Sequence, residues 1–402
     1  VYADEARIAA DAADARRAQG ISLGPLAGRI VSIKDLFDVA GEVTSAGSII
    51  LRNDPPAKAD APIVARLRRA GAVIVGKTNM SEFAFSGIGI NPHYGTPGCA
   101  ADETRVPGGS SAGAGVSVGE GTAEIAIGTD TGGSVRIPAS LNGCVGFKPT
   151  TGRVPTDGAY PLSYALDSIG PLAKTVADCA ATDAVMAGED PWDLAPMPVA
   201  GLRIGVPRGS LFTQTEDIVA QAFEETLSTL SKAGANIVEY DIEDLLSEMS
   251  DAMAEAPLVA IEAAAVHADW YESRAADFDQ AVLARIRRGA GYSAAKYIRL
   301  MRHRDELIAK MDARLAPLDI LALPATATTA VPIAPLVGDL DTFMTANILM
   351  LRNTTWGNQF DLTGLSLPMP GLVRPAGFMV MARRGQDRRV LDIAAGIEPL
   401  LA

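Results

Sequence analysis

Two glycine-flanked serines and one lysine are the residues of this sequence best suited to chemistry. Ser134 ends the segment Thr129-Asp-Thr-Gly-Gly-Ser134, which follows an apolar stretch. Glycines before a serine let backbone N–H groups converge on one point, as an oxyanion hole requires. Taken alone, this segment is more typical of a tight turn whose serine caps a helix. Its chemistry therefore depends on what else the fold brings near Ser134.

Lys34 closes the apolar run Ile30-Val-Ser-Ile33. A lysine at such a place usually extends its ammonium group into water. A buried lysine can instead lose its charge and act as a general base. Lowering its pKa from about 10.4 to about 7 requires roughly 4–5 kcal/mol of differential solvation, which full burial can supply. With Ser110 of the Gly-Gly-Ser-Ser segment as a bridge, a Ser-Ser-Lys relay would activate Ser134 without histidine.

A second serine motif points to different chemistry. Gly109-Ser-Ser111-Ala-Gly113 fits the GxSxG nucleophile elbow, which would make the chain a serine esterase using Ser111. That elbow needs a strand directly before it and a histidine partner. Pro107 makes the preceding segment a poor central strand. His267 and His303 lie in helical segments, where surface or capping roles are expected.

Composition excludes several other classes of function. The net charge of -13 argues against a nucleic-acid partner. No apolar run is long enough to span a membrane, and the first residues lack the pattern of a secretory signal. The three cysteines and three histidines show no metal-ligand spacing, so we expect no metal, no cofactor, no disulfide and a cytoplasmic setting. Because the chain begins at Val1, we expect further residues to precede it.

The order of the expected elements predicts an α/β fold. Helices are expected at 1–19, after Asp60 as N-cap, and from 388 to the end. Strands are expected at 30–33, 72–75, 123–127, 144–147, 202–206, 236–240, 320–323 and 377–381. The region between about 175 and 318 is mostly helical apart from its strands.

Several longer segments together resemble the amidase signature family. They are Gly28–Asp35, Gly76–Phe83, Gly108–Gly113, Gly128–Pro138 and Gly143–Thr150. The likeness is strong over residues 20–210 and returns in 353–369 and 377–384. It implies a large mixed β-sheet covered by helices on both faces. It further implies one domain, 1–402, with a catalytic core at 20–210, a variable helical substrate side at 211–345 and a C-terminal return to the sheet at 346–402.

The resemblance also implies roles for individual residues. Ser134 is the nucleophile, Ser110 the bridging serine that follows a cis peptide bond, and Lys34 the base. The oxyanion hole is formed by the backbone N–H groups of Thr131, Gly132, Gly133 and Ser134. Asp130 and Arg136 match family positions that brace this loop.

The substrate is expected to be a small-molecule amide, as in bacterial hydrolases of the malonamidase and carboxybiuret hydrolase kind. Candidates for the pocket wall are Met80, Phe83, Tyr160 and Trp356, although such residues are more often core. The rival function is the glutamine-hydrolysing subunit of a tRNA-dependent amidotransferase. A non-catalytic binding protein would have no reason to keep Lys34, Ser110 and Ser134 together. By analogy, we expect a homodimer.

Overall fold

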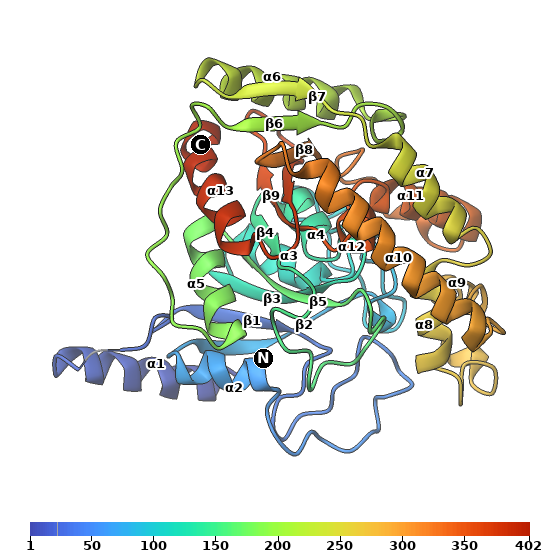
Figure 1. Ribbon diagram of the computed structural model, residues 1–402. Helices are drawn as coiled ribbons and strands as arrows, with labels where there is room; N and C mark the ends of the chain where they lie inside the picture. The colour runs from blue at the N-terminus through green and yellow to red at the C-terminus, as the bar shows by residue number, and fades with distance from the viewer. Residues whose placement is uncertain (22) are drawn as a thin grey trace.

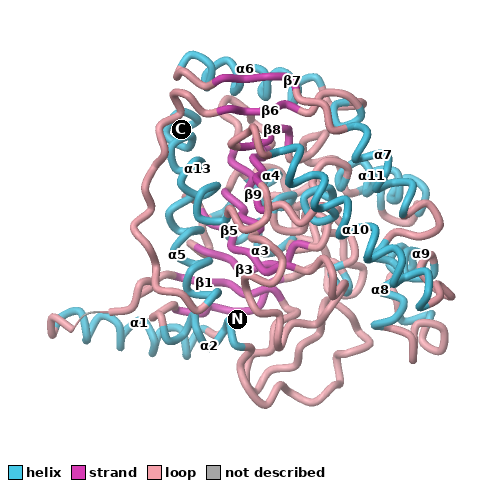
Figure 2. The backbone as a smooth tube through the Cα atoms, in the orientation of Figure 1, coloured by secondary structure: helices cyan, strands magenta, loops and turns pink. Residues whose placement is uncertain are grey.

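The computed structural model describes residues 1–21 and 23–402 of the chain (Figure 1). Its strands are β1 (Ile30–Lys34), β2 (Val73–Thr78), β3 (Ile125–Asp130), β4 (Val145–Lys148), β5 (Ser168–Ala173), β6 (Arg203–Val206), β7 (Asn236–Glu239), β8 (Ile320–Pro324), β9 (Thr363–Pro368) and β10 (Gly377–Ala382). They form one ten-stranded sheet in the order β2-β1-β3-β5-β4-β9-β10-β8-β6-β7. Figure 2 shows this sheet in magenta, running through the middle of the molecule.

The helices surround this sheet. They are α1 (Ala3–Ala18), α2 (Pro62–Arg69), α3 (Ala112–Glu120), α4 (Arg136–Asn142), α5 (Val176–Ala187), α6 (Asp217–Lys232), α7 (Glu243–Ala252), α8 (Leu258–Val266), α9 (Gln280–Arg287), α10 (Ala294–Leu315), α11 (Leu340–Leu351), α12 (Thr355–Gln359) and α13 (Asp387–Leu401). Short 3₁₀ turns lie at Glu82–Ala84, Ser210–Phe212, Ala275–Asp277 and Ala334–Leu336. In the part of the chain that the structure describes, no helix has the length and hydropathy needed to cross a bilayer.

The sheet is mixed, as the family resemblance implies. Strand β1 pairs in parallel with β2 and β3, and β6 pairs in parallel with β7 and β8. The pairs from β3 through β5, β4, β9 and β10 to β8 are antiparallel. Helices α5 and α13 pack together against β5 and β9, while α3 and α4 pack together against β3 and β4 (Figure 1). The predicted α/β class with helices on both faces is confirmed.

Two central strands, β5 and β9, have no counterpart among the expected strands. Each is a short segment that contains Pro and Gly, residues which normally argue against a central strand. Every residue of β5 is nevertheless buried, with Pro171 in register with Ile127 of β3. Tertiary burial outweighs local propensity at these positions.

The expected N-cap of α2 is also wrong. The N-cap is Ala61, and it makes no side-chain cap. Asp60 instead accepts from the backbone N–H of Ala40 at 2.8 Å and from Nε of Arg68 at 3.0 Å. The carboxylate therefore connects a loop to the helix surface, and Pro62 at the helix start removes one N–H that would need a cap.

The sheet places the candidate site residues at the carboxyl ends of neighbouring strands. Strands β1 and β3 are parallel neighbours, so their carboxyl ends, Lys34 and Asp130, lie on the same side of the sheet. Two loops follow this edge, one leading into α3 and the other into α4. They are joined by a hydrogen bond from the N–H of Ser111 to the carbonyl of Ser134 at 3.3 Å.

Candidate active site

Lys34 is a fully buried lysine at the end of β1. Its Nζ donates to Ser110 Oγ and to Thr129 Oγ1, each at 2.7 Å. Burial lowers the pKa of Lys34 to about 7, against the opposing influence of the Asp167 and Asp130 carboxylates. At neutral pH a large fraction of this amine is therefore uncharged and able to accept a proton.

Ser110 and Ser134 lie on the two adjoining loops. The peptide bond between Gly109 and Ser110 is cis. Both serines are buried, and Ser134 lines a cavity. Among the described residues no hydrogen bond joins the two hydroxyl groups directly. The hydrogen bond from Lys34 to Ser110 is thus formed in this structure.

The carboxylate of Asp130 organises the loop that carries Ser134. It accepts the backbone N–H groups of Gly133 (2.9 Å), Val135 (3.1 Å) and Arg136 (3.3 Å). The Arg136 side chain donates to the same carboxylate from Nε at 3.0 Å and from Nη2 at 2.8 Å, and both residues are fully buried. Burial alone would raise the pKa of Asp130, but Arg136 holds it well below its usual range. The loop is therefore built around a buried ion pair.

This ion pair changes which amides can form an oxyanion hole. The Gly133 N–H already donates to Asp130, whereas the amides of Thr131, Gly132 and Ser134 have no acceptor within the described residues. Gly133 has a φ of 133°, and a Cβ there would overlap Thr354 Oγ1. Of the four amides expected to be donors, the N–H of Gly133 is thus occupied by Asp130, and Gly133 is the residue that allows the turn.

Ser134 opens into a small cavity of about 40 Å³. Its lining residues are Ala84, Phe85, Ser86, Thr131, Gly132, Ser134, Leu162, Val259, Arg285, Leu351, Thr355 and Gln359. A larger cavity of about 310 Å³ shares five of them, namely Phe85, Val259, Arg285, Leu351 and Thr355. The two cavities are therefore neighbouring parts of one site, with the smaller one at Ser134.

Three of the four residues predicted for the pocket wall do not line either cavity. Met80 and Phe83 are buried in the core. Phe83 packs with Tyr160 (ring centroids 5.3 Å apart) and His267 (4.4 Å) in an aromatic cluster. Trp356 does line the larger cavity. The residues just after Phe83 line the cavity at Ser134 instead, because the chain turns there through left-handed backbone at Phe83 and Ala84.

The nucleophile-elbow interpretation of Ser111 finds no partner in the structure. No strand directly precedes it, and its Oγ donates to the carbonyl of Thr129 at 3.3 Å. His267 belongs to the aromatic cluster, His93 pairs with Glu82 at 3.0 Å, and His303 lies beside glutamates on the surface. Across residues 1–21 and 23–402, no histidine donates to or accepts from Ser111.

Several residues of the site are absent from the sequence-based prediction. Thr129 is the second partner of Lys34. Asp167 accepts from Thr131 Oγ1 at 2.6 Å, and Asn358 donates to Asp130 at 2.9 Å. Asp167 stands next to Ser168 and Asn358 stands next to Gln359, so no local contrast in polarity marks either residue in the sequence. Arg285 lies between Ala284 and Ile286 in α9, and a charged residue between apolar neighbours is the signal that could have found it.

The described residues contain no group of three or more His, Cys, Asp or Glu side chains that could hold a metal ion. All three cysteines are buried and free. The chemistry that these side chains offer at the site is that of a hydroxyl, a buried amine and backbone dipoles.

The site combines a buried lysine that is hydrogen-bonded to one serine with a glycine-lined turn that carries a second serine. These are the groups that a serine hydrolase without a catalytic histidine requires. Residues 1–391 match the Amidase family model, and the chain belongs to this family of amidase signature enzymes. It is an amidase, a hydrolase of carbon–nitrogen bonds other than peptide bonds.

Relatives and a solved structure agree with this membership. The chain is 40% identical to 2-amino-5-chloromuconic acid deaminase of Comamonas testosteroni over 408 residues, which cover 98% of this chain and 86% of that protein. It is 38% identical to the AtzE component of 1-carboxybiuret hydrolase from Pseudomonas sp. (strain ADP) over 340 residues, which cover 81% and 73%. The crystal structure of a glutamyl-tRNA(Gln) amidotransferase component from Thermotoga maritima superposes with a TM-score of 0.78 at 30% identity, covering 94% and 84%.

Proposed function

We propose that this amidase cleaves a carboxylic amide through an acyl-enzyme formed on Ser134, with Ser110 and Lys34 as its proton relay. The observation that carries the proposal is the 2.7 Å contact between Lys34 Nζ and Ser110 Oγ in a fully buried setting. A lysine that is half-neutral near pH 7 is matched to general-base work at that pH.

The steps follow from the positions of these groups. Neutral Lys34 takes the proton of Ser110 while Ser110 takes the proton of Ser134, and Ser134 Oγ bonds to the amide carbon. The carbonyl electrons move onto oxygen, near the free amides of Thr131, Gly132 and Ser134. The C–N bond then breaks, and the relay returns the proton to the departing nitrogen. Water hydrolyses the acyl-enzyme by the same route and restores Ser134.

Residues 211–345 are proposed to supply substrate recognition within one amidase domain, with 20–210 as its catalytic core. Val259 and Arg285 come from this part of the chain and line the cavity at Ser134. We further propose a homodimer in the cytoplasm. Three buried free thiols agree with a reducing compartment, and light scattering of the purified chain tests the dimer.

The rival function is the glutamine-hydrolysing subunit of a tRNA-dependent amidotransferase. It predicts that the chain alone is inactive and that glutamine hydrolysis appears only with a partner protein. The stand-alone amidase predicts ammonia or amine release by the purified chain from a panel of primary, aryl and ureido-type amides. Measuring that release without a partner separates the two functions.

The nucleophile is tested by labelling the enzyme with a fluorophosphonate and locating the adduct by peptide mass spectrometry. The expected adduct is on Ser134, and Ser134→Ala should prevent it. An adduct on Ser111 would overturn the assignment in favour of the nucleophile elbow.

A further inference from the structure

Arg285 lies where the two cavities meet, and its guanidinium group has no acidic partner among the described residues. Its Nη1 donates to the carbonyl of Phe85 at 2.6 Å, and its Cζ lies 4.0 Å from the centroid of the Phe85 ring. Within the described chain it forms no ion pair with a carboxylate. Because a guanidinium carries five N–H donors, most of them remain available to a bound molecule.

The surroundings of Arg285 are basic in an acidic protein. Arg285, Arg288 and Arg352 line the larger cavity, and no Asp or Glu stands among the described residues lining either cavity. The chain as a whole has a net charge of -13. A cleft lined by one sign of charge attracts ligands of the opposite sign. The charge of this site therefore favours the binding of an anion.

The charge of Arg285 is retained at neutral pH. Burial and the neighbouring Arg288 lower the pKa of Arg285 to about 9, which still leaves the group protonated at pH 7. A charge held in such a place without a counter-ion carries a desolvation penalty. An anionic group of the substrate would remove that penalty and form bidentate, charge-assisted hydrogen bonds.

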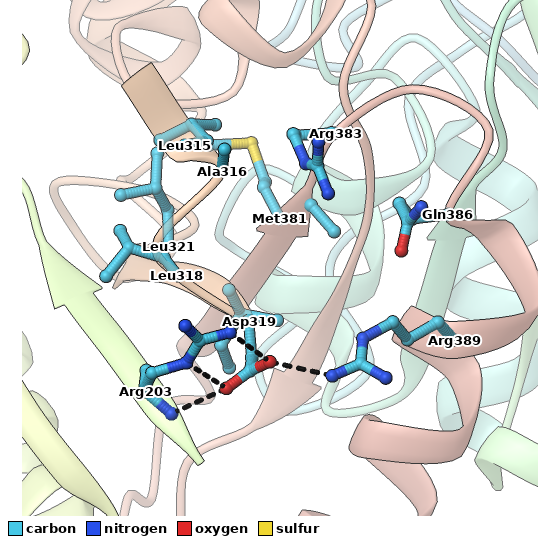
Figure 3. Close-up of a pocket in the computed structure, with 12 residues that line it drawn as sticks. Arg203, Leu315, Ala316, Leu318, Asp319, Leu321, Met381, Arg383, Gln386 and Arg389 are labelled. Carbon is cyan, nitrogen blue, oxygen red and sulfur yellow. Dashed lines mark hydrogen bonds and ion pairs between the residues drawn. The ribbon is translucent and has the colours of Figure 1, made fainter. Parts of the chain in front are cut away.

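In another arginine-rich cavity of this protein, the arginines are paired with a carboxylate. This cavity has a volume of about 240 Å³ and lies between β6, β8 and the start of α13 (Figure 3). There Arg203 and Arg389 both donate to Asp319, Arg203 from Nη2 at 3.1 Å and Arg389 at 2.7 Å. The contrast marks Arg285, which has no such carboxylate among the described residues, as a binding group.

We propose that Arg285 binds a free carboxylate of the substrate, and that the substrate is the monoamide of a short dicarboxylic acid. This inference rests on the proposed function and names its substrate class. Ser134 and Arg285 line the same small cavity of about 40 Å³, so the arm between amide and carboxylate is short. Gln359 lines the same cavity, is 4% exposed and has no hydrogen-bond partner for its Oε1 among the described residues, so it can accept from the substrate NH₂ group.

The same chemistry disfavours glutamine. Its α-ammonium group would enter a site where the described lining offers arginines and no carboxylate. A buried ammonium without an acidic partner is strongly unfavourable. The site therefore selects an anionic substrate that lacks an amino group. The charge of the residues lining the pocket thus distinguishes this amidase from a glutaminase.

The experiment compares kcat/KM for ammonia release from matched amides. Succinamic and malonamic acids carry the carboxylate, succinamide and malonamide replace it with a neutral amide, and glutamine adds an ammonium group. The wild type should prefer each acid over its diamide by about 10²-fold or more. Arg285→Met should lower kcat/KM for the acids by roughly 10²–10³-fold and leave the diamides within about threefold. The control Arg299→Met removes an equally charged, exposed residue of α10 that lines neither cavity and should change none of these values.

Equal wild-type rates on acids and diamides, or an Arg285→Met loss of the same size on both, would overturn the inference. Fluorophosphonate labelling of Ser134 distinguishes this result from failure of the proposed function, because labelling should persist in Arg285→Met. If that variant does not fold, competitive inhibition of the wild type decides. Succinate should inhibit and its dimethyl ester should not, and equal inhibition by both contradicts a carboxylate site.

Discussion

Lys34 Nζ lies 2.7 Å from Ser110 Oγ, and neither residue has any exposed surface. A charged ammonium group could make the same contact, but burial shifts the pKa of this lysine down and so favours its neutral form. The neutral amine has a lone pair to offer the serine hydroxyl. This relationship between two residues 76 positions apart is the basis of the proposed mechanism.

Two adjacent serines should differ sharply when removed. Ser110→Ala deletes the hydroxyl that contacts Lys34, so kcat should fall by about 10³-fold or more. Ser111→Ala removes a hydroxyl that donates to a backbone carbonyl and should reduce kcat by no more than a few-fold. Steady-state kinetics on one amide measures both variants. Equal losses would show that the GGSS segment has a structural role only.

Replacing Lys34 should stabilise the fold while it abolishes activity. A pKa lowered from 10.5 to about 7 corresponds to roughly 4–5 kcal/mol of unfavourable burial. Lys34→Met removes this penalty but also two hydrogen bonds worth about 1 kcal/mol each, so a net gain of about 2 kcal/mol is expected.

The pH dependence of this gain has a definite sign. Below pH 7 both the folded and unfolded states hold the proton, and the full penalty applies. Between pH 7 and 10.5 the unfolded state binds more protons, so wild-type stability rises with pH and the advantage of Lys34→Met shrinks. Urea unfolding at pH 6 and pH 9 measures it. A gain that does not change between these pH values would contradict the lowered pKa.

Breaking the Asp130–Arg136 ion pair should damage both stability and catalysis. Asp130→Asn leaves a buried guanidinium without its counter-charge, which costs about 3–5 kcal/mol. It also loosens the loop that presents Ser134, so kcat should fall at least about 10²-fold. Glu248→Gln, at a half-exposed pair with Lys310, is the matched control and should cost no more than about 1 kcal/mol. Similar losses in both variants would argue against the special role of Asp130.

Gly133→Ala should lower kcat by roughly 10²–10³-fold, because a shift of this turn moves the free amides of Gly132 and Ser134 away from the developing oxyanion. The added Cβ overlaps Thr354 Oγ1 and requires a backbone that alanine rarely adopts. Gly385→Ala is the control, because its φ of 75° is also positive but nothing lies within 4 Å of the new Cβ. That variant should lose about 1 kcal/mol of stability and keep its kcat. Full activity in Gly133→Ala would show that the turn geometry does not matter.

Much of the fold and part of the site could be predicted from the sequence. Motifs with glycines and serines at fixed spacing indicated the family and the neighbourhood of Lys34, Ser110 and Ser134. Apolar runs indicated most strands, but β5 and β9 were missed because both contain Pro and Gly. Burial of the whole strand accommodates these residues in β5, whereas Pro368 is the half-buried last residue of β9. The burial of a strand in the folded protein cannot be predicted from its local sequence.

The pocket could not be predicted for a related reason. Phe83 and Phe85 differ by two positions, yet one packs in an aromatic cluster and the other lines the cavity at Ser134. The left-handed backbone at Phe83 and Ala84 directs the Phe83 side chain into the aromatic cluster and the Phe85 side chain to the cavity. Arg285 reaches the same cavity from a helix far along the chain, and its lack of an acidic partner among the described residues is visible only in three dimensions.

In the proposed mechanism, the neutral amine of Lys34 activates Ser134 through Ser110. The rate of Ser134 acylation by a fluorophosphonate, measured against pH in the wild type and in Lys34→Ala, tests it most directly. We expect a wild-type rate that rises with pH to a plateau, with an apparent pKa near 7, and a Lys34→Ala variant at least about 10³-fold slower with no inflection there. A variant that reacts at the wild-type rate, or that keeps the same inflection near pH 7, would contradict it.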